Sequence, residues 1–327
     1  MSRNGISLSE WCAHSASYEA AARETEIENS GRGPFTRSVF VIARYHEVLR
    51  RLGLDTLEGV KHFRGELIKN HKGRRDIQRI IWPAAAGISS GSLPEKLTLF
   101  LKRNWKPYKK DGLKCLLTRG EACSQSRIEW ENSQSLQRAG LAVAEPIAFG
   151  EECGLFWERF SFVLTKAAPG ETTLDEFLRN NRNLDERREV FDALAGEVRK
   201  LHDAGLASPD LFTRHIFLER GTHSSPAVQN GTTQPKFCLI DMARLNRRRN
   251  LSPRFRARDL AALNVTAPLR FVSTRERLRF LKIYGGDRRL RGLIVDRTRH
   301  LLKRRKFGDF FADQAVDAAL AESSPTR

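Results

Sequence analysis

Residues 201–218 read Leu201-His-Asp-Ala-Gly-Leu-Ala-Ser-Pro-Asp-Leu-Phe-Thr-Arg-His-Ile-Phe-Leu218. Apolar residues at helical spacing lead into this stretch, and Gly205 predicts the end of that helix. A short apolar run, residues 215–219, follows and reads as a strand. Asp210 therefore lies in the loop between the helix and the strand, and His215 stands five residues further on, where the strand begins.

This spacing is typical of phosphoryl transfer from ATP. The reaction requires a cation at the phosphates, carboxylates for Mg²⁺ and a carboxylate that positions the attacking hydroxyl. Protein kinases take the positioning aspartate and a metal-binding side chain from one loop, at the spacing of Asp210 and His215. A second metal-binding aspartate should end the next strand but one, and Asp241 follows the apolar run 237–240. We therefore predict that Asp210 is catalytic and that His215 and Asp241 bind the metal.

An ATP-binding lysine and its glutamate partner are expected earlier in the chain. The short apolar run 97–102 reads as a strand and ends on Lys102. A helix is expected to open at Ser126, with Glu129 in its first turn and Gly140 as its stop. Lys102 and Glu129 have the order and context of the lysine–glutamate pair of kinases, so we predict that they pair and bind the cofactor.

Each of these residues also has an ordinary structural interpretation. Ser126 and Glu129 have the spacing of a capping box, so the glutamate could serve only to hold the helix end. Asp210 could be a turn or N-cap residue, Asp241 could begin a turn, and His215 could be a buried histidine. The competing candidates for the lysine–glutamate pair are Arg103, Lys106, Glu121 and Glu131.

Four segments are predicted along the chain. They are an N-terminal extension over residues 1–45, loosely ordered or helical, a β-rich lobe over 46–167, a mainly helical lobe over 168–312 and a tail over 313–327. Ala168-Pro-Gly170 marks the boundary between the lobes. Further strands are expected at residues 142–149, 160–165 and 236–241, a surface loop at 221–235, and arginine-rich helices at 259–311.

Several of these motifs together resemble the bacterial lipopolysaccharide kinase family. The resemblance covers residues 50–312. It rests on residues 201–218, Leu239-Ile-Asp-Met-Ala-Arg244, Arg258-Asp-Leu-Ala-Ala-Leu263, Phe100-Leu-Lys-Arg103 and Glu129-Trp130. It implies an α+β, protein-kinase-like fold with two lobes. It also implies an ATP- and Mg²⁺-dependent phosphotransferase that acts on a sugar hydroxyl, heptose or Kdo, of the lipopolysaccharide inner core. Such an enzyme would work at the cytoplasmic face of the inner membrane.

The chain matches the family at one unusual position and departs from the kinase pattern at others. Members of the family commonly have histidine where protein kinases have the loop asparagine, which fits His215. Ser208 stands where histidine or arginine is usual, and Ala243 stands where protein kinases have the glycine of Asp-Phe-Gly. A glycine-rich phosphate loop is represented only by Ala86-Gly-Ile-Ser-Ser-Gly-Ser92, which an ordinary hairpin turn explains equally well.

The charge of the chain indicates an anionic partner. Fifty-seven Lys and Arg against 39 Asp and Glu give a net charge of +18, which favours nucleic acid, an acidic membrane surface or a phosphorylated substrate. One basic cluster comprises seven arginines between Arg244 and Arg258, and a second, Lys303-Arg-Arg-Lys306, is flanked by Leu and Phe. A solvated face is the ordinary interpretation of both. Because basic residues mixed with Leu and Phe suit an interfacial helix, peripheral binding to an anionic membrane is the preferred hypothesis.

Other features of the composition limit the class of protein. No secretory signal is recognised, and the apolar runs are too short to span a bilayer. The five cysteines are scattered without a Cys-x-x-Cys pair, which favours reduced thiols in a cytoplasmic protein over disulfides or zinc. The arginine tracts contain few Tyr or Trp, so nucleic acid is a less favoured partner. Two alternatives to a core-sugar kinase stay open, namely a kinase of proteins or small molecules and an inactive or RNA-binding scaffold.

Overall fold

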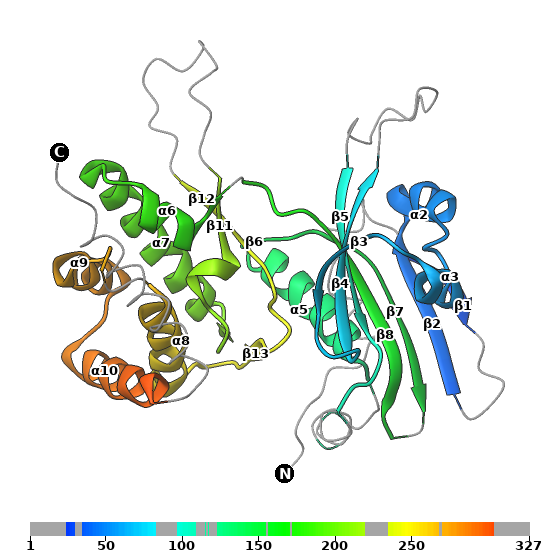
Figure 1. Cartoon of the computed structure of the whole chain (residues 1–327). Helices are drawn as coiled ribbons and strands as arrows, with labels where there is room; N and C mark the ends of the chain where they lie inside the picture. Colours follow the sequence, from blue (N-terminus) through cyan, green and yellow to red (C-terminus); the bar gives the residue numbers. More distant parts are fainter. Residues whose placement is uncertain are drawn as a thin grey trace. The chain divides into compact units, whose positions relative to one another are not determined.

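The structure is a computed structural model that describes residues 24–29, 35–82, 97–108, 115, 117, 123–154, 156–170, 172–219, 235–267 and 270–303. The chain divides into two compact units (Figure 1). The sheet unit comprises residues 1–133 and 144–167, and the helical unit comprises residues 134–143 and 168–327. The glycine-containing candidate at 86–92, most of the expected surface loop, Arg304–Lys306 and the predicted tail lie outside the described residues.

The sheet unit is built on a seven-stranded sheet in which all neighbours are antiparallel. Its strand order is β1-β2-β7-β8-β5-β4-β3. The strands are β1 (Glu24–Asn29), β2 (Phe35–Ile42), β3 (Glu66–Asn70), β4 (Arg75–Trp82), β5 (Leu97–Asn104), β7 (Pro146–Gly154) and β8 (Glu158–Lys166). The described helices of this unit are α2 (His46–Leu52), α3 (Leu57–His62) and the first part of α5 (Gln125–Arg138).

Alternating burial along β5 shows why this sheet forms. Leu97, Leu99 and Leu101 are buried, while the side chains between them are only partly buried. The buried face joins one hydrophobic cluster that includes Leu49 of α2 and Trp130 of α5. Lys102 lies on the opposite side of the strand from these leucines, so its side chain points away from this core.

The predicted N-terminal extension differs from the structure. Residues 24–29 and 35–42 are strands β1 and β2 of the sheet, so the prediction of a loosely ordered or helical segment was wrong for them. The apolar run of β2 contains the fully buried Val39 and Val41, but it pairs with β7, more than a hundred residues away. Pairing at such a distance in the sequence leaves little local signal.

The helical unit contains five helices among its described residues, besides the end of α5. They are α6 (Leu174–Asn180), α7 (Leu184–Asp203), α8 (Pro253–Thr266), α9 (Thr274–Tyr284) and α10 (Arg288–Leu302). A four-stranded sheet has the order β6-β12-β11-β9, and β10 pairs with β13. These strands are β6 (Ala142–Val143), β9 (Thr172–Thr173), β10 (Leu206–Ala207), β11 (Ile216–Glu219), β12 (Lys236–Leu239) and β13 (Asn246–Arg247). A 3-10 turn, η2, covers Thr213–His215.

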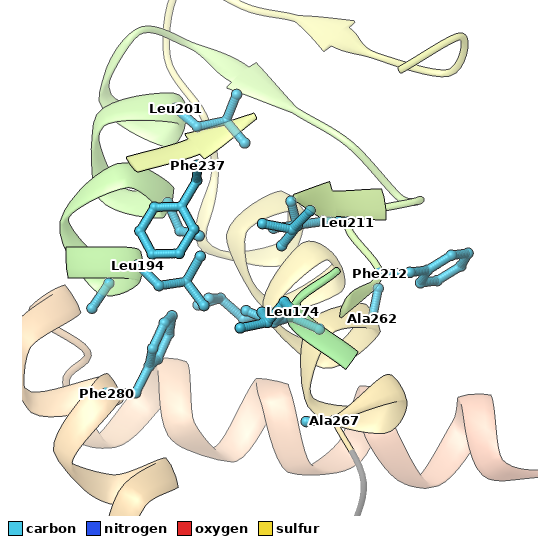
Figure 2. Close-up of a cluster of buried hydrophobic side chains, with 14 of the residues drawn as sticks. Leu174, Leu194, Leu201, Leu211, Phe212, Phe237, Ala262, Ala267 and Phe280 are labelled. Atoms are coloured by element: carbon cyan, nitrogen blue, oxygen red, sulfur yellow. The ribbon is translucent and has the colours of Figure 1, made fainter. Parts of the chain in front are cut away.

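Helix α7 forms where the sequence predicts it. Asn183 caps its first turn by accepting hydrogen bonds from Asp185 and Glu186. Its apolar stripe packs into the core of the unit, where Figure 2 shows Leu194 in one cluster with Phe237 of β12 and Phe280 of α9. The α+β prediction is confirmed, since strands dominate the first unit and helices the second. No helix among the described residues is long and apolar enough to span a bilayer.

Gly205 ends α7 for two physical reasons. Its φ is +74°, in the left-handed region that side chains other than glycine rarely adopt. A Cβ at this position would also lie 2.1 Å from the carbonyl oxygen of Arg248. The chain therefore turns into β10 and the following loop at the residue that the sequence marks.

The predicted strand over residues 142–149 is two strands of different sheets. Ala142–Val143 form β6, which pairs in parallel with β12 of the helical unit. Pro146 begins β7, which pairs with β2 and β8 of the sheet unit. The apolar pattern is continuous from β6 to β7, so it does not show that the two strands belong to different sheets. Such a pattern indicates which residues are buried and not which strand they pair with.

Candidate active site

Lys102 and Glu129 form an ion pair in the sheet unit. The Nζ atom of Lys102 lies 2.6 Å from Oε1 and 2.9 Å from Oε2 of Glu129. The two side chains are only 12% and 9% exposed, so the pair is largely shielded from solvent. Arg75 adds a second cation, 3.7 Å from the same carboxylate. The predicted pairing of the strand lysine with the helix glutamate is thus present.

The start of α5 is held by residues other than Ser126 and Glu129, which have the spacing of a capping box. Ser124, and not Ser126, accepts a hydrogen bond from a first-turn N–H, that of Arg127 at 3.0 Å. Two carboxylates from the sheet accept the preceding N–H groups, Glu151 from Ser124 at 3.1 Å and Glu158 from Gln125 at 2.9 Å. Negative charge at a helix N-terminus is favourable. The helix that carries Glu129 is thereby fixed to β7 and β8, and the glutamate itself is left to bind Lys102.

The carboxyl group of Glu158 has an unusual acidity. Burial raises its pKa to about 7, and the neighbouring charge of Glu151 adds to this. The hydrogen bonds from Ser161 and Gln125 and the charge of Arg75 act in the opposite direction. The Glu158 carboxyl group, which holds the start of α5, therefore titrates near neutral pH.

The described competitors of the lysine–glutamate pair have other partners or positions. Arg103 is buried, donates to Asp76 at 2.9 Å and to the carbonyl of Val60 at 2.8 Å, and thus holds the sheet unit together. Glu131 accepts from Arg127 at 3.2 Å on its own helix. Lys106 is exposed in the turn after β5, and Glu121 lies outside the described residues.

Asp210 sits in a tight loop of the helical unit. The Ser208 hydroxyl accepts from the Asp210 N–H at 3.3 Å, and the Asp210 carbonyl accepts from the Phe212 N–H at 2.7 Å. Ser208 is fully buried, so the hydroxyl that replaces the usual histidine or arginine still supports the loop. The carboxylate accepts hydrogen bonds from Nε and Nη2 of Arg244. It accepts none from a backbone N–H among the described residues. The N-cap interpretation of Asp210 is therefore not what the structure shows.

His215 and Asp241 lie at the same end of the β11–β12 hairpin as this loop. The strand register pairs Ile216 with Leu239, and the Ile240 N–H donates to the His215 carbonyl at 3.0 Å. The charge of Asp241 acts on both His215 and Arg244. Three predicted site residues, Asp210, His215 and Asp241, are thus brought together within the helical unit.

The His215 imidazole has the properties of a neutral ligand. Burial lowers its pKa, against the opposing effects of Asp241 and of the hydrogen bond to Asp210. Its Nδ1 lies 3.0 Å from the Asp210 carbonyl and Nε2 lies 3.3 Å from Nε of Arg214. A carbonyl only accepts, so the proton is assigned to Nδ1 and the lone pair to Nε2. In the structure this lone pair accepts a hydrogen bond from Nε of Arg214, so Nε2 can bind a metal only if Arg214 turns away from it.

Asp241 is held in a strained backbone conformation. Its φ is +55°, which costs a residue with a side chain on the order of 1 kcal/mol. Among the described residues no three His, Cys, Asp or Glu side chains are grouped to hold a metal ion by themselves. Mg²⁺ does not need such a group, since one or two carboxylates, substrate phosphates and waters commonly complete its shell. Asp241 with His215 fits that partial protein shell.

Beneath the loop lies a buried polar network that the sequence analysis did not identify. Asp259 of α8 is fully buried, accepts from Arg258 at 2.9 Å and lies 3.4 Å from Nε2 of His202. The other ring nitrogen of His202 lies 2.8 Å from the Tyr284 hydroxyl. The last turn of α7, shortly before the loop that carries Asp210, is therefore tied to α8 and α9. The signal for Asp259 was a single acid in the apolar run Ala257–Leu263.

A second contact joins η2 to α8. The Thr213 hydroxyl donates to the Thr266 carbonyl at 2.9 Å, and the Thr213 N–H donates to the Thr266 hydroxyl at 3.1 Å. Both side chains are buried. The loop from Asp210 to His215 is consequently held by the Ser208 hydroxyl at its start and by buried hydrogen bonds of Thr213 within it, as a preorganised site requires.

Comparison with known proteins gives the same fold and family. Residues 60–284 match the family described as "Lipopolysaccharide kinase (Kdo/WaaP) family". The lipopolysaccharide core heptose(I) kinase WaaP of Pseudomonas aeruginosa is 26% identical over 260 residues, 76% of this chain and 88% of that protein. The enzyme of the same name from Escherichia coli K12 is 24% identical over 238 residues, 72% of this chain and 83% of that protein.

A solved structure is also similar. The structure described as "WaaP in complex with acyl carrier protein" has a TM-score of 0.55 and 22% identity, covering 80% of this chain and 97% of that chain. At this identity the likeness shows the fold, and the predicted kinase-like, two-part α+β architecture is confirmed.

Proposed function

Because this chain belongs to the lipopolysaccharide kinase (Kdo/WaaP) family, we propose that it transfers the γ-phosphoryl group of ATP to a sugar hydroxyl of the lipopolysaccharide inner core. The chain is a kinase, as predicted, and its acceptor is an alcohol group. The observation that carries the proposal is the convergence of Asp210, His215 and Asp241 at one end of the β11–β12 hairpin. Heptose is the proposed sugar, since the curated relatives are named heptose(I) kinases.

Each residue has a proposed role that its surroundings support. Lys102 binds ATP phosphates and is oriented by Glu129, with which it makes two charge-assisted contacts. Asp241 and His215 hold Mg²⁺, which when bound neutralises charge on the phosphates. Asp210 orients the acceptor hydroxyl and takes its proton.

The Arg244 guanidinium is compatible with this role of Asp210. A carboxylate offers about four acceptor sites, so a sugar hydroxyl can bind Asp210 beside the two contacts from Arg244. The hydrogen bonds that Arg244 donates to Asp210 also raise the pKa of Arg244, which keeps this arginine charged. A cation beside Asp210 suits an acceptor that carries negative charge elsewhere in the molecule, as a glycolipid with lipid A phosphates does.

We further propose that the protein acts as a peripheral protein at the cytoplasmic face of the inner membrane. The acceptor is part of a glycolipid, and the net charge of +18 favours an anionic surface.

The proposal is tested with labelled ATP and two acceptors, lipopolysaccharide from a strain that lacks core phosphate and a protein extract. Label in the lipopolysaccharide supports the proposal, whereas label in the protein fraction alone contradicts it. Asp210→Asn should lower transfer by roughly a hundredfold or more with the fold intact. Asp296→Asn, at an exposed position on α10, is the matched control and should leave transfer unchanged. An active Asp210→Asn variant would disprove the assigned role.

A further inference from the structure

The first basic cluster predicted from the sequence is largely used inside the helical unit. Arg244 binds Asp210, and Arg258 binds the buried Asp259. Arg256 donates to Asp203 at 2.9 Å, and Arg248 lies over the ring of Phe255. Of the second cluster, only Lys303 is among the described residues. The two basic clusters of the sequence therefore do not show where exposed positive charge gathers on the folded protein.

A basic groove lies between the beginning of α7, the turn before α9 and α9 itself. We call it the α7–α9 groove. It has a volume of about 640 Å³, and α7 packs against α9 along its base. Its basic lining residues are Arg182, Arg187, Arg188, Arg270, Arg275, Arg279 and Lys282.

The base of the groove is rigid. Arg187 is buried and donates to Glu276 of α9 at 2.8 Å, to the Leu178 carbonyl at 3.0 Å and to the Phe271 carbonyl at 2.5 Å. These contacts join α6, α7, the turn and α9. Among the residues that the structure describes, Glu276 is the only carboxylate that lines the groove, and it accepts hydrogen bonds from Arg187 and Ser273. The groove thus has little negative charge of its own to offer to a cation.

The rim combines unpaired cations with exposed apolar side chains. Among the described residues, Arg182, Arg275 and Lys282 have no carboxylate within ion-pair distance. Leu184 is 71% exposed and Leu278 is 50% exposed. On α9, Arg275, Leu278 and Lys282 recur at spacings of three and four residues, so they share one helical face. A face of this kind, with leucine among cations, is typical of helices that lie in a membrane interface.

We propose that the α7–α9 groove docks the protein onto an anionic phospholipid bilayer, with Leu184 and Leu278 entering the interface and the rim cations binding lipid phosphates. The charge of the groove is complementary to that of anionic headgroups, and its exposed leucines are suited to acyl chains and not to a purely polar partner such as RNA. The inference rests on the proposed function, because it supplies the membrane contact that a kinase of a glycolipid needs.

The test measures binding of the full chain to vesicles of phosphatidylcholine alone and of equimolar phosphatidylcholine and phosphatidylglycerol. The variant Arg275→Gln/Lys282→Gln removes two rim cations, and Lys69→Gln/Lys72→Gln removes two exposed cations from the sheet unit as a matched control. The rim variant should bind anionic vesicles about thirtyfold more weakly, or about 2 kcal/mol at 1.4 kcal/mol per factor of ten, as expected for two cations near an anionic surface. The control should change binding by less than threefold.

Salt separates the two contributions. The effect of the charge variant should shrink in high salt, because exposed charges are screened. Leu278→Ser should weaken binding about tenfold at low and high salt alike, because it removes apolar contact. Arg275, Leu278 and Lys282 are all exposed, so these substitutions should leave folding unaffected.

Three outcomes would overturn the inference. They are no binding of the wild-type chain to anionic vesicles, equal losses in the rim and control variants, and a rim variant that keeps vesicle binding but loses binding to RNA. Transfer of phosphate to a delipidated core oligosaccharide is measured in parallel and should be unchanged by the rim substitutions. If the wild-type chain transfers no phosphate to this oligosaccharide, the proposed kinase function is refuted. The vesicle measurement needs neither ATP nor a sugar, so it tests the docking surface independently.

Discussion

Glu129→Gln should weaken catalysis by about thirtyfold in kcat/KM for ATP while the chain stays folded. The substitution keeps the size of the side chain and one carbonyl oxygen, but it removes the charge that faces Lys102. Because Lys102 Nζ contacts both carboxylate oxygens, at 2.6 and 2.9 Å, glutamine can replace only one of the two contacts with a neutral hydrogen bond. Lys102 then loses its fixed position toward the phosphates.

The magnitude lies between two limits. At an effective dielectric constant of about 20, unit charges about 3 Å apart interact by roughly 5 kcal/mol, which is an upper bound. Exposed ion pairs contribute about 0–1 kcal/mol, and breaking a buried pair costs about 3–5 kcal/mol. With side chains 12% and 9% exposed, and with one neutral hydrogen bond retained, we expect a loss of about 2 kcal/mol. This corresponds to roughly thirtyfold in rate.

The assay is steady-state kinetics over a range of ATP concentrations, with Glu131→Gln as the matched control on the same helix. Glu131 pairs with Arg127 and not with Lys102, so its variant should stay within threefold of the wild-type chain. Thermal denaturation of both variants establishes that they are folded. Equal losses in the two variants, or a Glu129→Gln enzyme within twofold of wild type, would refute the assigned role of the pair.

Two further predictions concern buried carboxyl groups. Burial raises the pKa of Glu158 to about 7, above an unfolded value of about 4.3, so the folded chain binds the extra proton and this group's contribution to stability falls as pH rises from about 4.5 to 7. Glu158→Gln should abolish that loss and make the chain more stable than wild type at pH 8 by up to about 3 kcal/mol. The free energy of unfolding is measured by urea titration at several pH values, and a variant whose free energy of unfolding depends on pH as steeply as that of the wild type would contradict this. Asp259→Asn should lower the free energy of unfolding by about 2–3 kcal/mol and reduce activity, because it leaves the His202 network without its charge. Asp296→Asn, on the exposed face of α10, should change stability by less than about 0.5 kcal/mol, and equal effects of the two substitutions would disprove the structural role of the buried aspartate.

Short-range features of the site could be read from the sequence. The helical periodicity that ends at Gly205 and the strand-like run that begins at His215 placed Asp210 between a helix and a strand, as the structure shows. The end of α7 at Gly205 and the strand that carries Lys102 follow from local conformational preferences and alternating burial. These features depend on neighbours in the chain, so the sequence determined them.

Long-range pairing decided what the sequence left open. Glu129 was the predicted partner of Lys102, with Glu131 and Glu121 as competing candidates, and the packing of α5 against the sheet places Glu129 beside Lys102. For the same reason residues 142–149 were wrongly given as one strand, since a burial pattern does not identify the partner strand.

The distribution of charge shows the limit most clearly. The sequence established the net charge of +18 and pointed to two basic runs. Three of the seven arginines of the first run pair with Asp210, Asp203 and Asp259 in the folded chain. Folding also brings residues of α7 and α9 that lie almost ninety positions apart into a separate basic groove. Total charge is additive along a chain and is fixed by composition. Which charges remain free depends on what each side chain meets after folding, and that is a property of the tertiary structure alone.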